Sequence, residues 1–184
     1  MKNKSRNIII GGIVGGTLLS TGAYLYMRNK KTIPEGVEAV NDFEPERYLG
    51  KWYEIARMDF RFEKNLINTT AEYSLNKDGS IKVVNRGYNY VKDEYKRSEG
   101  RAKFVSSPDE AMLKVSFFGP LYSGYNVIAI DDEYKYAFVA GRNLDYMWLL
   151  SREKTIPKSI ESAYLRKAKN IGYRIEDLVW VDQE

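Results

Sequence analysis

Short runs in which apolar and polar residues alternate follow one another between residues 50 and 152 of this 184-residue chain. Alternation with a period of two is typical of β-strands that bury one face. Eight runs are predicted as strands, at residues 50–58, 67–75, 80–90, 95–105, 111–118, 124–131, 134–141 and 145–152. The turns between them are short, which pairs neighbouring strands antiparallel. Asp78-Gly79 is typical of a hairpin turn because glycine accepts a positive φ.

The pattern changes to helical spacing after the last of these runs. Ile160, Ala163, Tyr164 and Ala168, together with the long side chain of Lys167, recur at helical spacing. We expect Thr155 to cap this helix, Pro157 to lie in its first turn, and Asn170 with Gly172 to end it. A short last strand is predicted at residues 178–181.

This order of elements predicts an all-β protein. Eight antiparallel strands can close into an up-and-down barrel that has no exposed edge strand and holds one small ligand. One C-terminal α-helix is expected to pack outside the barrel. A β-sandwich is the alternative that the pattern leaves open.

The N-terminal region carries a long uncharged segment. Residues 8–27 contain no charged side chain, and about twenty residues of helix span roughly 30 Å, the thickness of a bilayer core. Two interpretations compete: a retained anchor flanked by basic residues, or a cleavable signal with an apolar core at residues 8–19. We therefore expect an N-terminal hydrophobic helix within an anchor or signal segment (1–31), a linker (32–42) and a barrel domain (43–184).

The composition excludes several classes of function. The chain has no cysteine and no histidine, which removes thiolate nucleophiles, imidazole acids and bases, and the commonest ligands of zinc and haem. We expect no cofactor and no metal. The first 31 residues hold six of the 29 Lys and Arg residues and none of the 25 Asp and Glu residues, so the remainder carries 23 basic against 25 acidic residues. A basic surface for nucleic acid is therefore not indicated.

Several motifs resemble those of one protein family. Gly50-Lys51-Trp52 resembles the Gly-x-Trp signature of the lipocalins, Asp131 with Tyr134 resembles their second turn motif, and Arg152 matches the basic residue that ends their last long strand. The similarity extends from about Phe43 to Asp182. The runs that are most similar to the bacterial lipocalins and the apolipoprotein D group are residues 48–57, 115–120, 125–129 and 146–152.

The resemblance implies a lipocalin barrel that binds, stores or transports a fatty acid or a lysophospholipid in the bacterial cell envelope. Bacterial members are typically outer-membrane lipoproteins attached through a lipid-modified N-terminal cysteine, whereas this chain has an uncharged segment and no cysteine. We expect a membrane-associated protein whose barrel faces the periplasm or the exterior. The resemblance also implies that Trp52 and Arg152 meet at the closed end, with the guanidinium over the indole.

Side-chain alternation assigns the walls of the barrel. If Trp52 points inward, then Glu54, Ala56 and Met58 do so too, and an inward Arg152 brings Trp148 inward. The expected ligand-binding residues are Ala56, Met58, Ala71, Tyr73, Phe118, Tyr122, Tyr125, Val127, Ala137, Val139 and Trp148. The expected structural residues are Gly50, Trp52, Asp131, Tyr134 and Arg152. Ordinary core packing is the alternative for each wall residue.

Apolar residues in or beside the predicted loops are expected to line the mouth of the barrel. They are Phe60, Phe62, Phe117, Phe118, Leu121 and Tyr122. The nearby Arg57, Arg61 and Lys64 can pair with a carboxylate or phosphate head group, although charged residues near loops are commonly just solvated.

Three functions are compatible with this sequence. The favoured one is a non-enzymatic binder of a small hydrophobic ligand, tethered to or exported across a membrane. The second is an enzyme on the same barrel, in which Glu54, Asp59 or a tyrosine transfers protons to or from a lipid-like substrate. The third is a membrane-tethered interaction module whose barrel is filled by its own side chains. A second copy of the chain is a candidate partner.

Overall fold

The computed structural model describes residues 32–61 and 63–184. The predicted anchor or signal helix in residues 1–31 and the predicted mouth residue Phe62 lie outside the described residues. Within the described ranges, no helix is long and apolar enough to cross a membrane.

Nine strands and three short or medium helices make up the described chain. The strands are β1 (Gly50–Met58), β2 (Leu66–Leu75), β3 (Ile81–Asn89), β4 (Glu94–Phe104), β5 (Met112–Phe118), β6 (Leu121–Ile130), β7 (Tyr136–Gly141), β8 (Met147–Ser151) and β9 (Leu178–Trp180). The helices are α2 (Pro45–Tyr48), α3 (Lys158–Ile171) and the 3₁₀ helix η1 (Ile175–Asp177).

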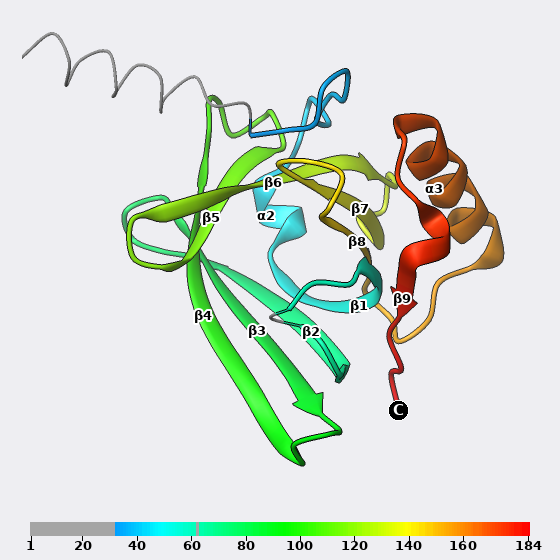
Figure 1. The fold of residues 1–184 in the computed structure, drawn as a ribbon. Coiled ribbons are helices and arrows are strands. Elements are labelled where there is room, and N and C mark those ends of the chain that lie inside the picture. Colours follow the sequence, from blue (N-terminus) through cyan, green and yellow to red (C-terminus); the bar gives the residue numbers. More distant parts are fainter. Residues whose placement is uncertain (1–31, 62) are drawn as a thin grey trace, which may run out of the picture. The chain divides into compact units, whose positions relative to one another are not determined.

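The first eight strands form a closed antiparallel barrel. Each strand pairs with the next along the chain, and β1 pairs with both β8 and β2, which closes the sheet. The ninth strand adds to the free side of β1, where residues 56–58 pair with residues 178–180. Helix α3 lies outside the barrel on the side of β7 and β8 (Figure 1). The predicted all-β barrel with one outer C-terminal helix is therefore confirmed.

The two halves of β1 have different neighbours. Residues 50–53 pair with residues 70–73 of β2, whereas the second half pairs with β8 and β9. A register shift lies between Glu54 and Ala56. The extra residue of such a bulge reverses which side chains point inward beyond it. The alternation that begins at Trp52 therefore does not continue to the end of the strand.

The C-terminal segment bridges the place where β1 and β2 separate. The Val181 amide donates to the Ile55 carbonyl at 2.9 Å. The side-chain amide of Gln183 donates to the carbonyls of Glu54 and Thr69, each at 2.8 Å. The last residues thus satisfy backbone acceptors on both strands at the seam of the barrel.

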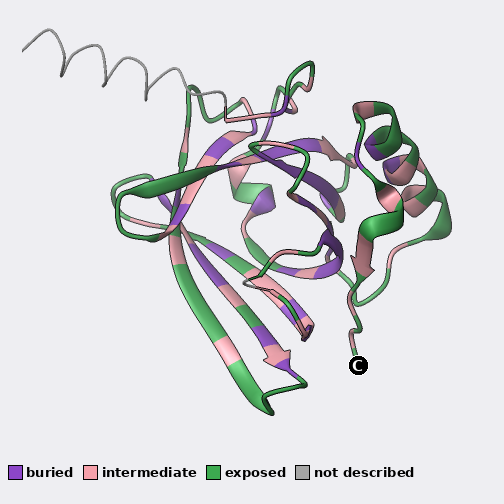
Figure 2. Cartoon of the chain, in the orientation of Figure 1, coloured by how far each residue is buried: buried purple, intermediate pink, exposed green. Residues whose placement is uncertain are grey.

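Apolar residues form two clusters, one inside the barrel and one between the barrel and α3. The interior cluster contains Trp52 with residues of every barrel strand, and the helix-side cluster includes Phe138, Tyr164 and Tyr173. Figure 2 shows buried residues concentrated in β1 and β6 to β8, while exposed residues follow much of β4. The β7 and β8 wall is therefore buried on both faces.

Helix α3 begins later than the sequence indicates. Its N-cap is Pro157, which supplies no side-chain hydrogen bond. The predicted cap by Thr155 is wrong, because the helix starts two residues too late for it, at Lys158. The Thr155 carbonyl accepts a hydrogen bond from the Ser151 hydroxyl at 2.8 Å. The helix ends as expected at Gly172, whose φ of 108° is a left-handed conformation that glycine adopts without strain.

One end of the barrel is closed by α2 and the tryptophan beneath it. The Trp52 indole nitrogen donates to the Tyr48 carbonyl at 2.8 Å. The Arg152 guanidinium carbon lies 3.9 Å from the centroid of the Trp52 ring, which is the contact implied by the family resemblance. Gly50, with a φ of 90°, lets the chain turn from α2 into β1 beside Arg152.

The turn between β6 and β7 completes the closed end. The Asp131 carboxylate accepts hydrogen bonds from the backbone amides of Lys135 and Tyr136, at 2.8 and 2.6 Å. The Tyr134 hydroxyl accepts a hydrogen bond from the Glu44 amide at 2.8 Å. Both residues therefore hydrogen-bond to the backbone at this end of the barrel.

Residues 32–42, the predicted linker, lie along the barrel. The Val40 amide donates to the Val127 carbonyl at 2.9 Å, and the Val40 carbonyl accepts from the Ala111 amide at 2.8 Å. The Thr32 carbonyl accepts a hydrogen bond from the Asn126 side chain at 2.7 Å. A Cβ atom on Gly124 would lie 1.7 Å from that same carbonyl oxygen, so only glycine permits this approach.

Candidate functional site

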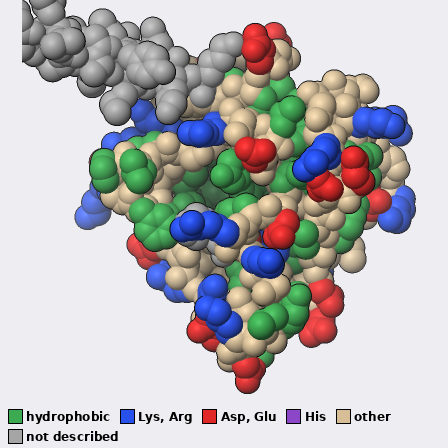
Figure 3. All heavy atoms as spheres, viewed as in Figure 1, with side chains coloured by type: hydrophobic (Ala, Val, Ile, Leu, Met, Phe, Trp, Pro, Cys, Tyr) green, Lys and Arg blue, Asp and Glu red, His purple; other side chains and the backbone are tan. Residues whose placement is uncertain are grey.

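A cavity of about 260 Å³ occupies the barrel above the closed end. Apolar side chains of β3, β4 and β5 make most of one wall, among them Ile81, Val83, Leu113 and Val115. Phe118 and Leu121 line the cavity although they are 66% and 76% exposed, so the cavity reaches the surface at the β5–β6 hairpin. Figure 3 shows the hollow, floored by hydrophobic side chains and surrounded by charged ones of both signs.

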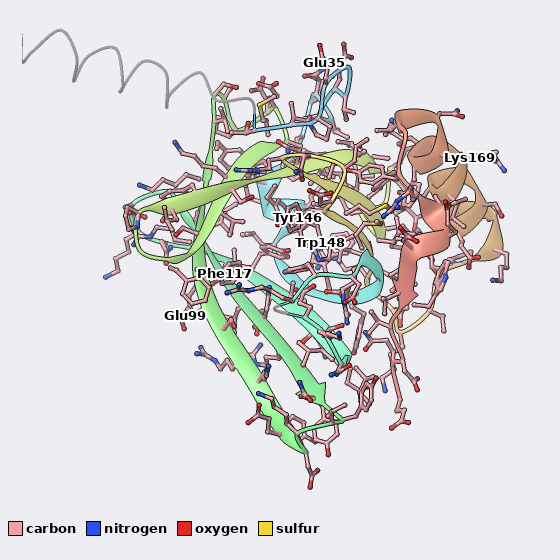
Figure 4. The ribbon with its side chains drawn as sticks, viewed as in Figure 1. Glu35, Glu99, Phe117, Tyr146, Trp148 and Lys169 are labelled. Carbon is pink, nitrogen blue, oxygen red and sulfur yellow. The ribbon has the colours of Figure 1, made fainter. Side chains whose placement is uncertain are left out.

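Aromatic rings form the opposite wall. The rings of Tyr146 and Trp148 stack with centroids 6.4 Å apart, and Figure 4 shows them side by side at the centre of the molecule. Phe60 meets both edge to face, at 5.6 and 5.9 Å. Tyr125 also stacks against Trp148, with ring centroids 6.4 Å apart. Residues of β6, of β8 and the position before it, and of the loop after β1 thus supply an aromatic surface inside the barrel.

A second chamber of about 260 Å³ adjoins the first. The two share Glu54, Phe60, Glu63, Asn85, Phe117 and Phe118. The second chamber extends between β2 and β4, where Thr69, Arg86 and Lys96 line it. A ligand in the main cavity can therefore extend toward a more polar region beside β3.

Three tyrosine hydroxyl groups form a polar cluster in the main cavity. The Tyr125 hydroxyl lies 2.6 Å from the hydroxyls of both Tyr48 and Tyr73. Burial raises the pKa of each hydroxyl above its usual value, so all three remain neutral at physiological pH. Hydrogen bonding within the cluster thus uses at least two of the three hydroxyl hydrogens.

A buried charge cluster lies in the wall formed by β1 and the loop that follows it. Arg57 is 1% exposed, and its Nη1 donates to Glu54 Oε1 at 2.8 Å. Its Nη2 donates to the carbonyls of Glu63 and Leu66 at 2.6 and 3.3 Å. Glu63 Oε2 lies 3.8 Å from Arg57 Nε and accepts a hydrogen bond from Trp148 Nε1 at 3.2 Å. Two carboxyl groups therefore share one guanidinium.

The excess of acid over base in this cluster changes its protonation. Desolvation raises the pKa of Glu63 to about 8, and repulsion by the Glu54 carboxylate adds to this effect, while Arg57 opposes it. Desolvation also raises the pKa of Glu54, against the attraction of Arg57. Near neutral pH, Glu63 is therefore mostly neutral, while Glu54 Oε1 lies 2.8 Å from Arg57 Nη1 in the geometry of an ion pair.

Some of the predicted wall residues lie in the cavity. They are Ala71, Tyr73, Phe118, Tyr125 and Trp148. Tyr146 and Leu150, inward by the same alternation as Trp148, also line it.

The structure places the other predicted wall residues elsewhere. Val127, Ala137 and Val139 point into the barrel, but they pack in the interior cluster outside the cavity lining. Ala56 and Met58 belong to the helix-side cluster, because the bulge after Glu54 turns them away from the interior. Tyr122 lies outside the cavity, with its ring 5.6 Å from the Lys114 ammonium. These are corrections to the predicted cavity lining.

The residues predicted at the mouth divide in the same way. Phe60, Phe117, Phe118 and Leu121 line the cavity, whereas Tyr122 does not. Arg57 is buried in the charge cluster instead of facing a head group. Arg61 and Lys64 are exposed and do not line the cavity.

Other cavity residues were not singled out from the sequence. The strand residues among them, such as Val83 and Asn85, follow a simple alternation and could have been found from it. Tyr48 and Glu63 carry no such signal, because they lie in α2 and in a loop, where side-chain direction depends on tertiary contacts. Among the residues that the structure describes, no group of three or more acidic side chains is placed to hold a metal ion.

Comparison with known proteins agrees with this architecture. The family model described as "Lipocalin-like domain" matches residues 43–183. The outer membrane lipoprotein Blc of Citrobacter freundii is 49% identical over 164 residues, which cover 89% of this chain and 93% of that protein. Apolipoprotein D of Macaca fascicularis is 37% identical over 150 residues, or 78% of each chain.

Solved structures show the same fold at low sequence identity. The cockroach allergen Per a 4 has a TM-score of 0.65 and 20% identity, and the match covers 83% of this chain and 96% of that one. Insecticyanin of the tobacco hornworm has a TM-score of 0.65 and 21% identity, covering 81% and 85%. Because the family model matches nearly the whole described barrel, this chain belongs to the lipocalin family.

Proposed function

We propose that this protein binds a long-chain lipid, a fatty acid or a lysophospholipid, and stores or transports it in the bacterial cell envelope. The observation that supports this most is the cavity itself, which is apolar, open at one end and joined to a second chamber. Together the two chambers fall within the size range of pockets that hold small organic ligands. The similarity to lipocalins supports a small hydrophobic ligand as a class, and the choice of a fatty acid or a lysophospholipid is our proposal.

The apolar walls are sufficient to hold an acyl chain without a specific polar clamp. Burial of each methylene gains about 0.8 kcal/mol, so about twelve methylenes gain on the order of 10 kcal/mol. This gain offsets much of an association cost of about 4 to 15 kcal/mol. The rings of Phe60, Tyr146 and Trp148 offer an aromatic surface against which such a chain packs.

We propose that residues 1–31 attach the barrel to a membrane as a retained anchor or carry it across as a signal, with residues 32–42 connecting the two parts. The similarity to proteins named outer membrane lipoproteins supports an envelope location. Attachment through a lipid-modified cysteine is not available to this chain, which has no cysteine. The uncharged segment at residues 8–27 is long enough to replace it.

Proton transfer within the cavity is the rival function. Its support is the mostly neutral Glu63 close to Glu54, which pairs with Arg57, since two carboxyl groups in different environments at one site are the components of acid–base catalysis. We favour binding because Glu54 is held by Arg57 and because the walls are otherwise apolar. Turnover of a lipid-like substrate that disappears in a Glu54→Gln variant would establish the rival.

Ligand binding to delipidated protein tests the proposal. Native mass spectrometry of the purified full-length chain, before and after addition of a fatty acid or a lysophospholipid, is expected to show one bound lipid per barrel. Ala71→Trp fills the cavity and is expected to abolish the complex. Ser74→Trp, on an exposed position of the same strand, is the matched control and should bind as the parent does. A barrel that takes up neither lipid would refute the proposal.

A further inference from the structure

The second chamber is more polar than the main cavity, and its polar groups come from three neighbouring strands. Thr69 and Thr70 of β2, Asn85 of β3, and Lys96 and Ser98 of β4 line it. Ser98 is exposed and Lys96 is half-buried, so the chamber is in contact with solvent. A polar group attached to an acyl chain in the main cavity therefore finds hydrogen-bonding partners here without losing all of its water.

Lys96 points into the barrel. It lies opposite Gly87 in the antiparallel pair of β3 and β4, two positions along from the pair of Asn85 with Ser98. Directly opposite residues of a strand pair point to the same face, and so do residues two apart on one strand. Asn85 lines both chambers, so Lys96 lies on the inward face with it. The residues on either side of Lys96 point outward and are exposed.

The Lys96 ammonium has no acidic partner among the described residues. The nearby arginines of β3 and β4 form ion pairs on the outer face, Arg86 with Glu72 and Arg97 with Glu99, both at 2.7 Å. Lys96 has no such neighbour on the inner face. A cation inside a ligand chamber that pairs with no acid is available to an anionic ligand.

The two acids that line the chamber do not cancel this cation. Glu54 Oε1 lies 2.8 Å from Arg57 Nη1, in the geometry of an ion pair. The Glu63 carboxyl accepts a hydrogen bond from Trp148, and its raised pKa of about 8 keeps it mostly neutral near pH 7. Because the acids and Arg57 together carry little net charge, Lys96 gives this part of the barrel a positive charge.

Uncharged groups beside Lys96 complete the site. Asn85 Oδ1 is buried and has no hydrogen-bond partner among the described residues. The same side-chain amide carries an NH₂ group, and a half-turn about χ2 exchanges the two ends. Ser98, directly opposite Asn85, adds a hydroxyl donor. A carboxylate or phosphate at this position receives a charge-assisted hydrogen bond from Lys96 and further hydrogen bonds from its neighbours.

We propose that Lys96 binds the anionic head group of the lipid, a carboxylate or a phosphate, in the second chamber, while the acyl chain lies in the main cavity. The inference rests on the proposed lipid-binding function and adds the place and the charge of the head group. The two chambers share part of their lining, so one ligand occupies both. The apolar walls supply most of the affinity, and Lys96 sets the direction in which the lipid lies.

Three ligands of equal chain length test the proposal: dodecanoate, monododecyl phosphate and dodecanol. Each displaces the uncharged fluorescent probe N-phenyl-1-naphthylamine from the delipidated full-length protein near neutral pH, and the equal chains cancel the apolar contribution. Lys96→Met removes the charge and keeps a long side chain. It is expected to raise the half-displacing concentration of the two anions about tenfold, the factor expected from one hydrogen bond to a charged group, and to leave that of dodecanol unchanged.

Lys103→Met is the matched control, because Lys103 is exposed on the outer face of the same strand, and it is expected to change none of the three concentrations. Lys96→Arg keeps the charge and is expected to retain both anions. Weaker binding of one anion alone supports the inference and identifies the head group as carboxylate or phosphate. Unchanged binding of both anions in Lys96→Met, or an equal loss of dodecanol, would overturn the inference and leave lipid binding intact. Failure of all three ligands to displace the probe from the parent protein would overturn the proposed function itself.

Discussion

Removing the Arg152 side chain is expected to destabilise the closed end of the barrel strongly. Its guanidinium donates to four backbone carbonyls, three of which lie within 2.9 Å. The acceptors are Lys51, Arg47, Leu49 and Tyr134. They belong to the continuous α2–β1 segment and to the β6–β7 turn, so one side chain ties together two segments that are distant in sequence.

The magnitude follows from these contacts. Hydrogen bonds from a charged donor contribute about 1.5 to 3 kcal/mol each when buried, and less here because Arg152 is only partly buried. The contact with the Trp52 ring at 3.9 Å adds about 0.5 to 2 kcal/mol. We expect Arg152→Ala to lower the free energy of unfolding by about 3 to 5 kcal/mol. Arg152→Lys keeps the charge but loses the forked geometry, and should cost about half as much.

Urea unfolding followed by far-ultraviolet circular dichroism measures the effect. Arg97→Ala is the matched control, because Arg97 is exposed and forms a surface ion pair with Glu99 at 2.7 Å. It should cost less than about 1 kcal/mol. If Arg152→Ala cost no more than this control, the guanidinium would not be what holds the closed end together, and the reasoning would be refuted.

Three further predictions concern the seam, the cavity wall and the N-terminal segment. Stability should fall as pH rises from about 5 to 8, by at most about 1.4 kcal/mol per pH unit, because the folded protein keeps a proton on Glu63 that the unfolded chain releases. Glu63→Gln should flatten this slope in urea titrations at several pH values, and an unchanged slope would assign it to another group. Gln183→Ala should cost about 1 to 2 kcal/mol by removing the hydrogen bonds between β1 and β2, and a loss no larger than that of Glu184→Ala would contradict this. Gly124→Ala should lower the melting temperature, with a cost of about 1 to 3 kcal/mol, since its Cβ would overlap the Thr32 carbonyl; equal melting of the parent and the variant would disprove this close approach.

Much of the fold follows from local patterns along the chain. The eight predicted strands all exist, because a period of two suits only a half-buried strand. Tyr73 with Ala71, and Trp148 with Leu150, line the cavity as alternation predicts. Strand β6 begins earlier than expected, at Leu121, since pairing with Phe118 across a tight turn extends it.

The sequence alone did not locate the cavity within the barrel. Alternation correctly turns Val127, Ala137 and Val139 inward. It contains no information on how far along the barrel axis each residue lies, and these three pack in the interior core instead of lining the cavity. The bulge after Glu54 reverses the direction of Ala56 and Met58, and nothing in the local composition announces it.

The sequence by itself determined the fold class and the helix outside the barrel, because periodicity and turn chemistry act over a few neighbours. The contact of Trp52 with Arg152 at the closed end was implied by the family resemblance and not by any local pattern. Only the tertiary structure decided the chemistry of the cavity. Glu54 and Arg57 lie on β1, and Glu63 lies in the loop that follows it. Trp148, which donates to Glu63, lies on β8, 85 residues further along the chain. The protonation of the two acids depends on burial and on one another, which are properties of the packed barrel and not of any local segment.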